Sequence, residues 1–345
     1  MNEQVLSHRM NRSSTFKAIG AALLVAAPCI LCTGCFDGGI LLTPVSTRRE
    51  LVESTLIRES FFARDKIAII DVTGTISNSA SGGLFGGGEN PTSLLLEQLH
   101  KARRDSRVKA VLLRINSPGG TVTASELMHD EIRAFRKETS KPVIAVLMDV
   151  AASGGYYIAC ACDEIVAHPS TITGSIGVIM QTVQIAGTLA KLGVTTDAIT
   201  SGPNKDAGSP FRTMTPEERE LFQKIIDEMY ERFVQVVVQG RPNLDEATVR
   251  RIADGRVYTA AQAVELGLVD RLATMREVIR STKKRIGAEK IRVVAYHRPL
   301  GYKPNYYAHT PAPGSIDINL IRIDLPNWLG STTPKFMYLW QPGSH

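Results

Sequence analysis

Residues 143–157 read Val-Ile-Ala-Val-Leu-Met-Asp-Val-Ala-Ala-Ser-Gly-Gly-Tyr-Tyr. The apolar part predicts a buried strand, and the small residues that follow place Ser153 at a break before a helix. Such a corner pushes the serine side chain out of the backbone and leaves the next amide free to bind an anion, as a serine nucleophile requires. Ala151 stands where the Gly-x-Ser-x-Gly elbow of the α/β-hydrolases has its first glycine, so that fold is disfavoured.

The segments around this corner alternate between strand and helix patterns. Strands are expected at 66–72, 108–115 and 164–167, and helices at 92–104 and 123–137. This order predicts an α/β domain with a mostly parallel sheet, right-handed crossovers and flanking helices.

Two further helices have clear start signals. Thr215 and Glu218 fit a capping box with a proline between them, and an apolar stripe then runs to Gly240. Packing against the core is the more common cause of such a stripe, although a groove-binding helix for a partner is conceivable. A second capped helix is expected from Thr259 to Gly267.

Composition limits the class of protein. The 345 residues are 43% hydrophobic with a net charge of +6, which describes one large globular domain or two ordinary ones. The charge is mild, and only 6% of residues are aromatic. We therefore expect no nucleic-acid partner.

The N-terminus has the pattern of a targeting segment. Basic residues lead into an apolar run at 18–31, which fits the core of a signal peptide and is short for a bilayer span. The sequence Cys32-Thr-Gly-Cys35 follows and resembles a bacterial lipoprotein processing site, at which Cys35 would receive lipid. Without cleavage, residues 18–36 would form a marginal anchor. Both alternatives predict a domain on the periplasmic side of a bacterial cell membrane.

The spacing of the cysteines does not indicate a metal site. Three of the five cysteines lie in the targeting segment, and Cys160 and Cys162 are separated by one residue. That spacing does not favour a disulfide between them, and no further ligands stand at metal-binding distance along the chain. We interpret both as small buried residues behind the serine corner and expect no cofactor.

A serine nucleophile needs a base, and Lys205 is the best candidate. None of the seven histidines stands in a convincing context, so a Ser-His-Asp triad is unsupported. Lys205 lies in a loop rich in turn residues; its amine would have to be uncharged near pH 7, which burial in a water-poor pocket supplies. Asp206 should then point away, and the Ser175 hydroxyl is a candidate to orient the amine. A lone lysine is more often a solvated surface charge.

Pro118-Gly119-Gly120 supplies a possible oxyanion hole. Two glycines after a strand let the backbone approach a ligand closely. The amide of Gly119 or Gly120, paired with that of Gly154, would give two donors to the oxyanion of an acyl-transfer intermediate. By itself the motif is only a turn, and no Gly-Lys-Ser/Thr follows, so it does not indicate a phosphate loop.

Five motifs together resemble the signal peptide peptidase A family, the S49 family of serine–lysine proteases. They are Asn-Ser-Pro-Gly-Gly (116–120), Ala-Ala-Ser-Gly-Gly-Tyr-Tyr (151–157), Thr-Gly-Ser-Ile-Gly-Val (173–178), Lys-Asp-Ala-Gly-Ser-Pro-Phe-Arg (205–212) and Asp-Gly-Arg-Val-Tyr-Thr (254–259). The resemblance implies a Clp-protease/crotonase-like fold, with Ser153 as nucleophile and Lys205 as general base. It also implies an oxyanion hole at Gly119 and Gly154, and a hydrogen bond from Ser175 to the lysine.

The resemblance covers one domain, like the short members of the family. It divides the chain into a targeting segment at 1–35, a linker at 36–60, a protease domain at 61–285 and a tail at 286–345. It implies a homo-oligomeric ring in which the lysine meets the serine of a neighbouring subunit. It further implies peptide substrates, namely signal peptides left in the membrane and cut within their hydrophobic segments. Extended apolar peptides of that kind bind by strand addition.

Two other functions compete with this hypothesis. A crotonase-type acyl-thioester enzyme would share the fold and the oxyanion hole without needing Ser153 or Lys205. A non-catalytic scaffold that binds membrane proteins would need neither residue, because fold alone does not determine function. The tail, which ends near Leu339 and Trp340, is expected to pack on a neighbour or to lie across the groove.

Overall fold

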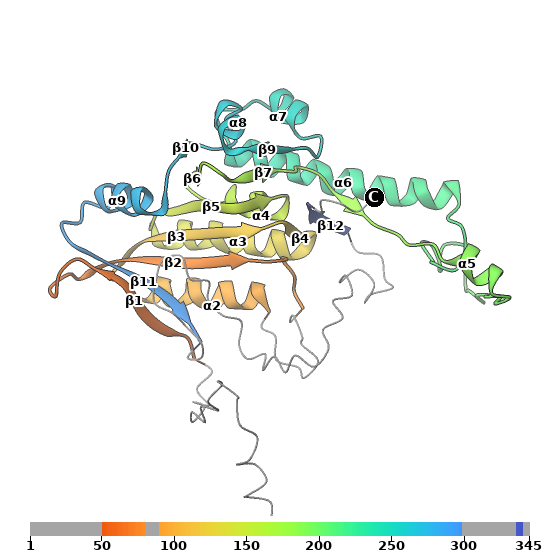
Figure 1. Ribbon diagram of the computed structural model, residues 1–345, viewed down its shortest axis with the longest axis horizontal. Helices are drawn as coiled ribbons and strands as arrows, with labels where there is room; N and C mark the ends of the chain where they lie inside the picture. Colours follow the sequence, from red (N-terminus) through yellow and green to blue (C-terminus); the bar gives the residue numbers. More distant parts are fainter. Residues whose placement is uncertain (1–49, 80–89, 299–335, 341–345) are drawn as a thin grey trace, which may run out of the picture. The chain divides into compact units, whose positions relative to one another are not determined.

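The computed structural model describes residues 50–79, 90–298 and 336–340 (Figure 1). The predicted targeting segment at 1–35, with Cys35, lies outside these residues. Across the described ranges, no helix combines the length and the apolar character needed to cross a membrane.

A mixed sheet lies at the centre of the described residues. Its nine strands follow the order β1-β11-β2-β3-β5-β6-β10, with β7 paired to β5 and β9 paired to β7. Every pair is parallel except β1 with β11 and β7 with β9. The strands are β1 Val52–Arg58, β2 Asp65–Thr73, β3 Val108–Ser117, β5 Val143–Ala152, β6 Glu164–Ala167, β7 Ile172–Gly174, β9 Val257–Thr259, β10 Arg271–Leu272 and β11 Ile291–His297. The predicted α/β class with a mostly parallel sheet is confirmed.

Helices cover the two faces of this sheet (Figure 1). Alternate residues of each strand point to opposite faces, so Ala68 and Ile70 pack with α2, α3, α4 and α6, whereas Ile67 and Ile69 pack with α9. The helices are α2 Pro91–Arg104, α3 Val122–Thr139, α4 Gly154–Ala159, α5 Ala186–Lys191, α6 Pro216–Gly240, α7 Glu246–Ile252, α8 Ala260–Glu265 and α9 Met275–Arg285. The strands and helices expected around Ser153 agree with these bounds within two residues.

The helix start signals are confirmed, but the interpretation of the long apolar stripe holds only in part. Thr215 and Thr259 both form complete capping boxes at the starts of α6 and α8. The stripe of α6 is buried at Phe233 and Val237, near its C-terminal end, while Leu221 is exposed. The N-terminal half of α6 extends beyond the sheet (Figure 1). The other described residues therefore cover less of this half than of the C-terminal half.

The sheet includes two strands that the sequence analysis assigned to the linker and the tail. β1 begins at Val52, and β11 lies between β1 and β2, with Ile67 opposite Val293. Their pairing joins residues more than 200 positions apart, from Val52 to His297. No local pattern marks such partners, so the sequence alone did not assign either segment to the sheet.

A second, three-stranded sheet lies beside the glycine turn. Its order is β4 Gly119–Thr121, β12 Phe336–Leu339 and β8 Ile179–Met180, and both pairs are antiparallel. The tail therefore contributes a strand next to Gly119.

Candidate active site

Ser153 occupies the predicted corner between β5 and α4. Its backbone has φ 53° and ψ −117°, a conformation that costs a residue with a side chain about 1–3 kcal/mol. Two hydrogen bonds hold it: the Ser153 N–H donates to the Gly174 carbonyl at 2.8 Å, and the Ser153 carbonyl accepts from the Tyr157 N–H at 2.9 Å. Strain maintained in this way at a strand-to-helix turn is typical of a functional residue.

The hydroxyl of Ser153 is buried and has no hydrogen-bond partner within residues 50–79, 90–298 and 336–340. The residue is 1% exposed, and its Oγ makes no hydrogen bond to the described part of the chain. Leaving a buried hydroxyl unpaired costs about 1–3 kcal/mol. The same fact shows that no described histidine or lysine of this chain is within hydrogen-bonding distance of Oγ.

The glycine turn lies directly against the serine corner. Gly119 has φ 100°, and a Cβ built there would overlap the Tyr338 carbonyl oxygen and lie 2.7 Å from the Gly154 nitrogen. A Cβ on Gly154 would lie 3.2 Å from the Cα of Gly119. The structure thus brings together the two glycines predicted for the oxyanion hole. Only glycine fits at Gly119, where backbone meets backbone.

A serine that the sequence analysis missed holds this turn. The Ser117 hydroxyl donates to the Gly74 carbonyl at 2.6 Å and accepts from the Gly119 N–H at 3.1 Å. The side chain of Asn116 adds two hydrogen bonds, to Asp149 at 3.1 Å and from the Val150 N–H at 3.1 Å. In this structure the Gly119 amide is therefore engaged by Ser117, so its role as an oxyanion donor stays a prediction.

Ser175 lies near the serine, whereas Lys205 does not reach it. Ser175 follows Gly174, whose carbonyl binds the Ser153 N–H, and its own N–H donates to the Arg256 carbonyl at 2.8 Å. Lys205 is exposed, on the segment after α5. Figure 1 shows α5 beyond the N-terminal end of α6, well away from β5 and α4.

The carboxylate of Asp206 binds an arginine. The sequence analysis expected this carboxylate to point away from Lys205, because a nearby negative charge would favour the charged form of the amine. Arg212 binds Asp206 through Nε at 2.7 Å and Nη2 at 2.8 Å, and it also binds Glu218 of the α6 capping box. The hydrogen bonds from Arg212 hold the pKa of Asp206 below its usual value. This network attaches the Lys205 loop to the start of α6.

Comparison with known proteins identifies the family. The sequence profile of Peptidase family S49 matches residues 135–289. The chain is 38% identical over 247 residues to a protein named "Putative signal peptide peptidase SppA" from Enterococcus faecium, covering 72% of this chain and 71% of that protein. The chain belongs to peptidase family S49.

Other relatives carry protease names. The chain is 35% identical to "Serine protease SPPA, chloroplastic" from Arabidopsis thaliana, over 70% of this chain and 36% of that protein. It is 34% identical to "Protease 4" from Haemophilus influenzae, over 66% of this chain and 36% of that protein. This S49 peptidase is a serine endopeptidase, and the acyl-thioester hypothesis loses its support.

The ionisable groups packed around α4, next to Ser153, are held in their neutral forms by burial. Burial raises the pKa of the Cys160 thiol to about 12, so it stays protonated and does not compete with Ser153. Cys160 and Cys162 are both buried free thiols, as expected. Burial also lowers the pKa of His129, which packs edge-on against Tyr157 with ring centroids 5.1 Å apart.

An aromatic cluster missed by the sequence analysis lies next to the corner. Tyr157 of α4, Phe233 of α6 and Tyr338 of β12 contact one another through their rings, with centroids 4.7–5.1 Å apart. Tyr157 is four positions after Ser153, but its partners come from distant elements. The only signal in the sequence was the apolar end of the tail.

Proposed function

We propose that this peptidase degrades signal peptides left in a bacterial membrane by cutting within their hydrophobic segments. In this proposal the active unit is a homo-oligomeric ring, and Lys205 of one subunit is the base for Ser153 of its neighbour. The domain is held on the periplasmic side of the membrane by its N-terminal segment, with Cys35 as a lipidation site.

One observation supports a dyad shared between subunits. Within a single chain, the Ser153 hydroxyl and the Lys205 amine lie apart from each other. The Ser153 hydroxyl is buried and unpaired among the described residues, and Lys205 is exposed on a different part of the molecule. A nucleophile without a base is inactive. A neighbouring copy supplies the missing amine without any rearrangement of the core.

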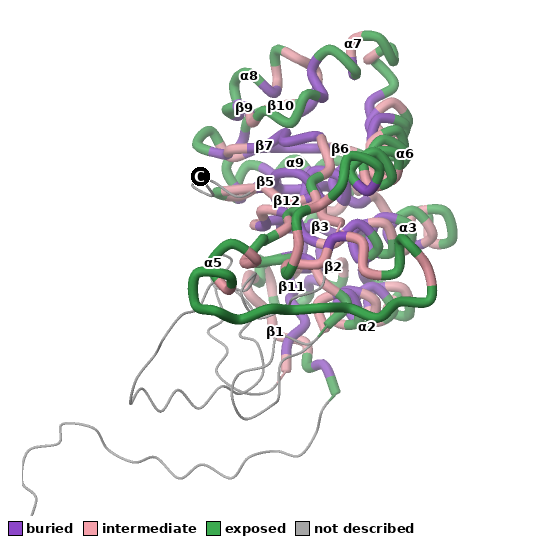
Figure 2. The backbone as a smooth tube through the Cα atoms, turned by 90° about the vertical axis from the view of Figure 1, so that its right-hand side faces the viewer, coloured by how far each residue is buried: buried purple, intermediate pink, exposed green. Residues whose placement is uncertain are grey.

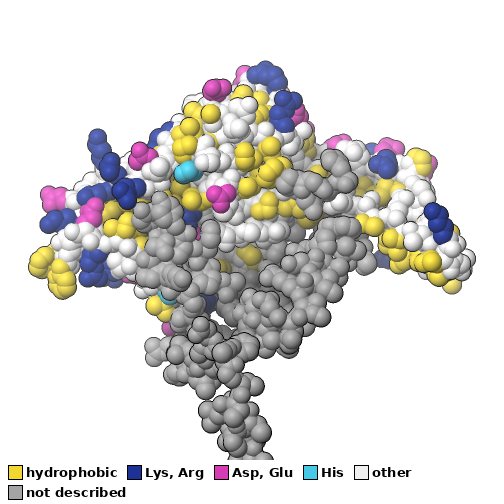
Figure 3. Space-filling model, viewed as in Figure 1, with side chains coloured by type: hydrophobic (Ala, Val, Ile, Leu, Met, Phe, Trp, Pro, Cys, Tyr) yellow, Lys and Arg dark blue, Asp and Glu magenta, His cyan; other side chains and the backbone are white. Residues whose placement is uncertain are grey.

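The segment that carries Lys205 has the composition of an interface. We call residues 179–212 the arm. Its residues are largely exposed in the single chain (Figure 2), including Leu192 at 71% and the fully exposed Ile199. Hydrophobic side chains gather along the arm in Figure 3. Large exposed apolar patches mark surfaces that another protein covers.

In this proposal, acyl transfer uses four groups of the site. The neutral amine of Lys205 takes the Ser153 proton as Oγ attacks the substrate carbonyl carbon. The Gly154 N–H, with the Gly119 N–H if it leaves Ser117, donates to the oxyanion. The ammonium returns the proton to the leaving amine. Water, activated by the same amine, hydrolyses the acyl-enzyme.

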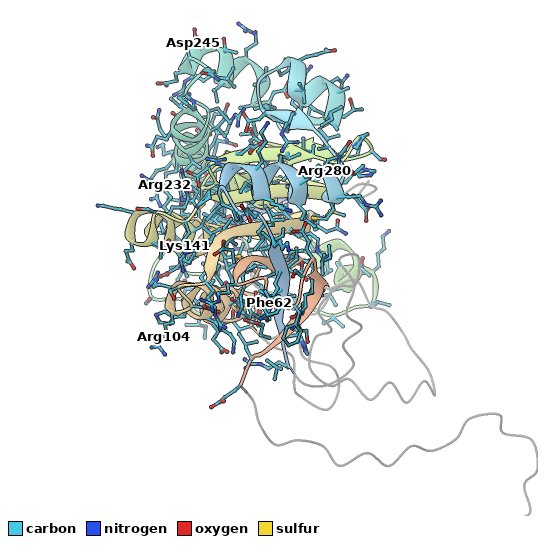
Figure 4. All side chains as sticks on the ribbon, turned by 90° about the vertical axis from the view of Figure 1, so that its left-hand side faces the viewer. Phe62, Arg104, Lys141, Arg232, Asp245 and Arg280 are labelled. Atoms are coloured by element: carbon cyan, nitrogen blue, oxygen red, sulfur yellow. The ribbon has the colours of Figure 1, made fainter. Side chains whose placement is uncertain are left out.

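Exposed aromatic side chains support the membrane part of the proposal. In the turn between β1 and β2, Phe61 and Phe62 are 81% and 84% exposed, between the exposed Arg58 and Arg64. Figure 4 shows Phe62 at this end of the molecule. Aromatic and basic residues together suit an anionic bilayer surface.

Mixing two inactive variants tests the shared dyad. Ser153→Ala and Lys205→Ala should each abolish peptide cleavage while the protein stays folded. When equal amounts are dissociated and reassembled together, about one quarter of the sites in a random ring pair an intact serine with a neighbour's intact lysine. We therefore expect about one quarter of wild-type turnover. A mixture as inactive as its parts, at an unchanged oligomer size, contradicts a dyad shared between subunits.

A further inference from the structure

The strand that leads to Ser153 is irregular near its end. β5 pairs with β3 in an even register from Val143 to Leu147, and the pairing resumes with Ala151 opposite Ser117. Between these two points β3 advances by two residues and β5 by four, so β5 carries a β-bulge at residues 148–150. Bulges are rare between parallel strands and concentrate next to active sites, where they change the direction of a side chain.

β5 exchanges one neighbouring strand for another across this bulge. Before the bulge it pairs with β6 as far as Leu147, and after the bulge it pairs with β7 from Val150 to Ala152. Figure 1 shows β6 and β7 on one side of β5 and β3 on the other. The bulge therefore determines where the last residues of β5 lie, and Ser153 follows directly after them.

Thr171 holds the bulge from the side of β7. Its side chain is 1% exposed, and its hydroxyl donates to the Met148 carbonyl at 2.6 Å, with the Leu147 carbonyl oxygen 3.0 Å away. Thr171 immediately precedes β7, the strand that ends at Gly174. The Gly174 carbonyl accepts from the Ser153 N–H at 2.8 Å. Thr171 thus fixes the bulge to the same strand that binds the serine.

Asn116 holds the bulge from the side of β3. It lies on β3 between the pairs that flank the bulge. Its Oδ1 accepts from the Val150 N–H at 3.1 Å, and its Nδ2 donates to Asp149 Oδ2 at 3.1 Å. A bulge interrupts the regular main-chain pairing between strands, and here an amide side chain supplies a partner to a main-chain donor.

We propose that Asn116 and Thr171 are positioning residues, which hold the bulge of β5 and thereby set the place and direction of the Ser153 hydroxyl for attack. This inference rests on the proposed role of Ser153 as the nucleophile, and it adds two residues that act through the main chain of β5. A misplacement of about 1 Å between reacting groups costs about a hundredfold in rate. Because the bulge sets the attacking group, its loss lowers kcat and leaves KM nearly unchanged.

Removal of one hydroxyl tests the role of Thr171. Thr171→Val keeps the branched shape and loses the donor. With a fluorogenic apolar peptide as substrate, kcat should fall at least about tenfold while KM changes by less than about twofold. Thr171→Ser restores the hydroxyl and should return kcat to within about threefold of the wild type.

Thr139→Val is the matched control for this test. Thr139 is half-buried and its hydroxyl donates to the Phe135 carbonyl at 2.7 Å, but it lies before the first residue of β5, at the opposite end of the strand from Ser153. Its kcat should stay within about twofold of the wild type. Equal kcat values for Thr171→Val and Thr139→Val, at the same oligomer size, would overturn the role of Thr171.

An exchange of partners tests Asn116 without a change of volume. Asn116→Asp sets two carboxylates against each other at the bulge, and kcat should fall about tenfold. The addition of Asp149→Asn restores a donor opposite an acceptor, and kcat should recover to within about threefold of the wild type. Asp149 is exposed, so the repulsion in the single variant is partly screened and the protein stays folded. An unchanged kcat in Asn116→Asp, or no recovery in the double variant, would overturn the role of Asn116.

A fluorophosphonate probe separates failure of this inference from failure of the proposed function. The probe reacts with a serine nucleophile without any peptide, so its rate of labelling should fall in Thr171→Val by the same factor as kcat. Ser153→Ala should neither cleave the peptide nor take up the probe. Cleavage by Ser153→Ala would refute the nucleophile itself. An inactive Ser153→Ala beside fully active Thr171→Val and Asn116→Asp would keep the nucleophile and refute the positioning role.

Discussion

Two buried serines of opposite hydrogen-bonding state give a direct test of the site. Ser153 is 1% exposed and its hydroxyl has no partner among the described residues, whereas Ser117 is fully buried and makes two hydrogen bonds, to Gly74 and from Gly119. An unpaired buried hydroxyl costs about 1–3 kcal/mol, and each hydrogen bond made contributes about 0.5–1.5 kcal/mol. Ser153→Ala should therefore raise the free energy of unfolding by about 1–3 kcal/mol, and Ser117→Ala should lower it by a similar amount.

The comparison is best made in a Lys205→Ala protein. If a neighbour's Lys205 binds the Ser153 hydroxyl in the assembly, Ser153→Ala raises the free energy of unfolding less in the protein that keeps Lys205 than in the Lys205→Ala protein. The difference between the two backgrounds then measures the coupling of the dyad. The strain at φ 53° is present in both serine and alanine, so the change reports the hydroxyl alone.

Urea unfolding followed by circular dichroism gives the two free energies. The slopes of the unfolding transitions should agree between variants, which shows that a shift of midpoint is a change of stability. If Ser153→Ala lowers the stability of the Lys205→Ala protein as Ser117→Ala does, the hydroxyl has a partner in solution and the reasoning fails.

Three further predictions concern other parts of the molecule. Burial alone would raise the pKa of Asp270, but hydrogen bonds from Arg241 hold it below its usual value; the stability it contributes is present above about pH 4 and is lost as pH falls below that. The stability difference between wild type and Asp270→Asn should therefore shrink in acid, and a constant difference down to pH 2.5 in urea titrations would contradict it. Gly154→Ala places a Cβ 2.5 Å from the Ser125 hydroxyl, so kcat should fall at least about a hundredfold, and wild-type kcat would refute the close fit. Phe62→Ser should reduce binding of the intact protein to anionic vesicles in flotation assays, and unchanged binding would remove the turn from the membrane proposal.

Local patterns in the sequence determined the central strands, the helices around them and the serine corner. The apolar runs of β2 and β3, the capping boxes of α6 and α8, and the small residues around Ser153 all depend on neighbours in the chain, so they can be predicted without a fold. The S49 motifs likewise stand in the sequence itself. These patterns carried the α/β class and the choice of nucleophile.

Only the tertiary structure decided which distant residues meet. It placed β11 between β1 and β2, brought Ser117 to the amide of Gly119, and inserted Tyr338 of β12 between Tyr157 and Phe233. It also showed that the Ser153 hydroxyl is buried and has no hydrogen-bond partner in the part of the chain that the structure describes. Pairing partners and burial depend on contacts between residues far apart in the chain, and a strand carries no local mark of the strand it will join.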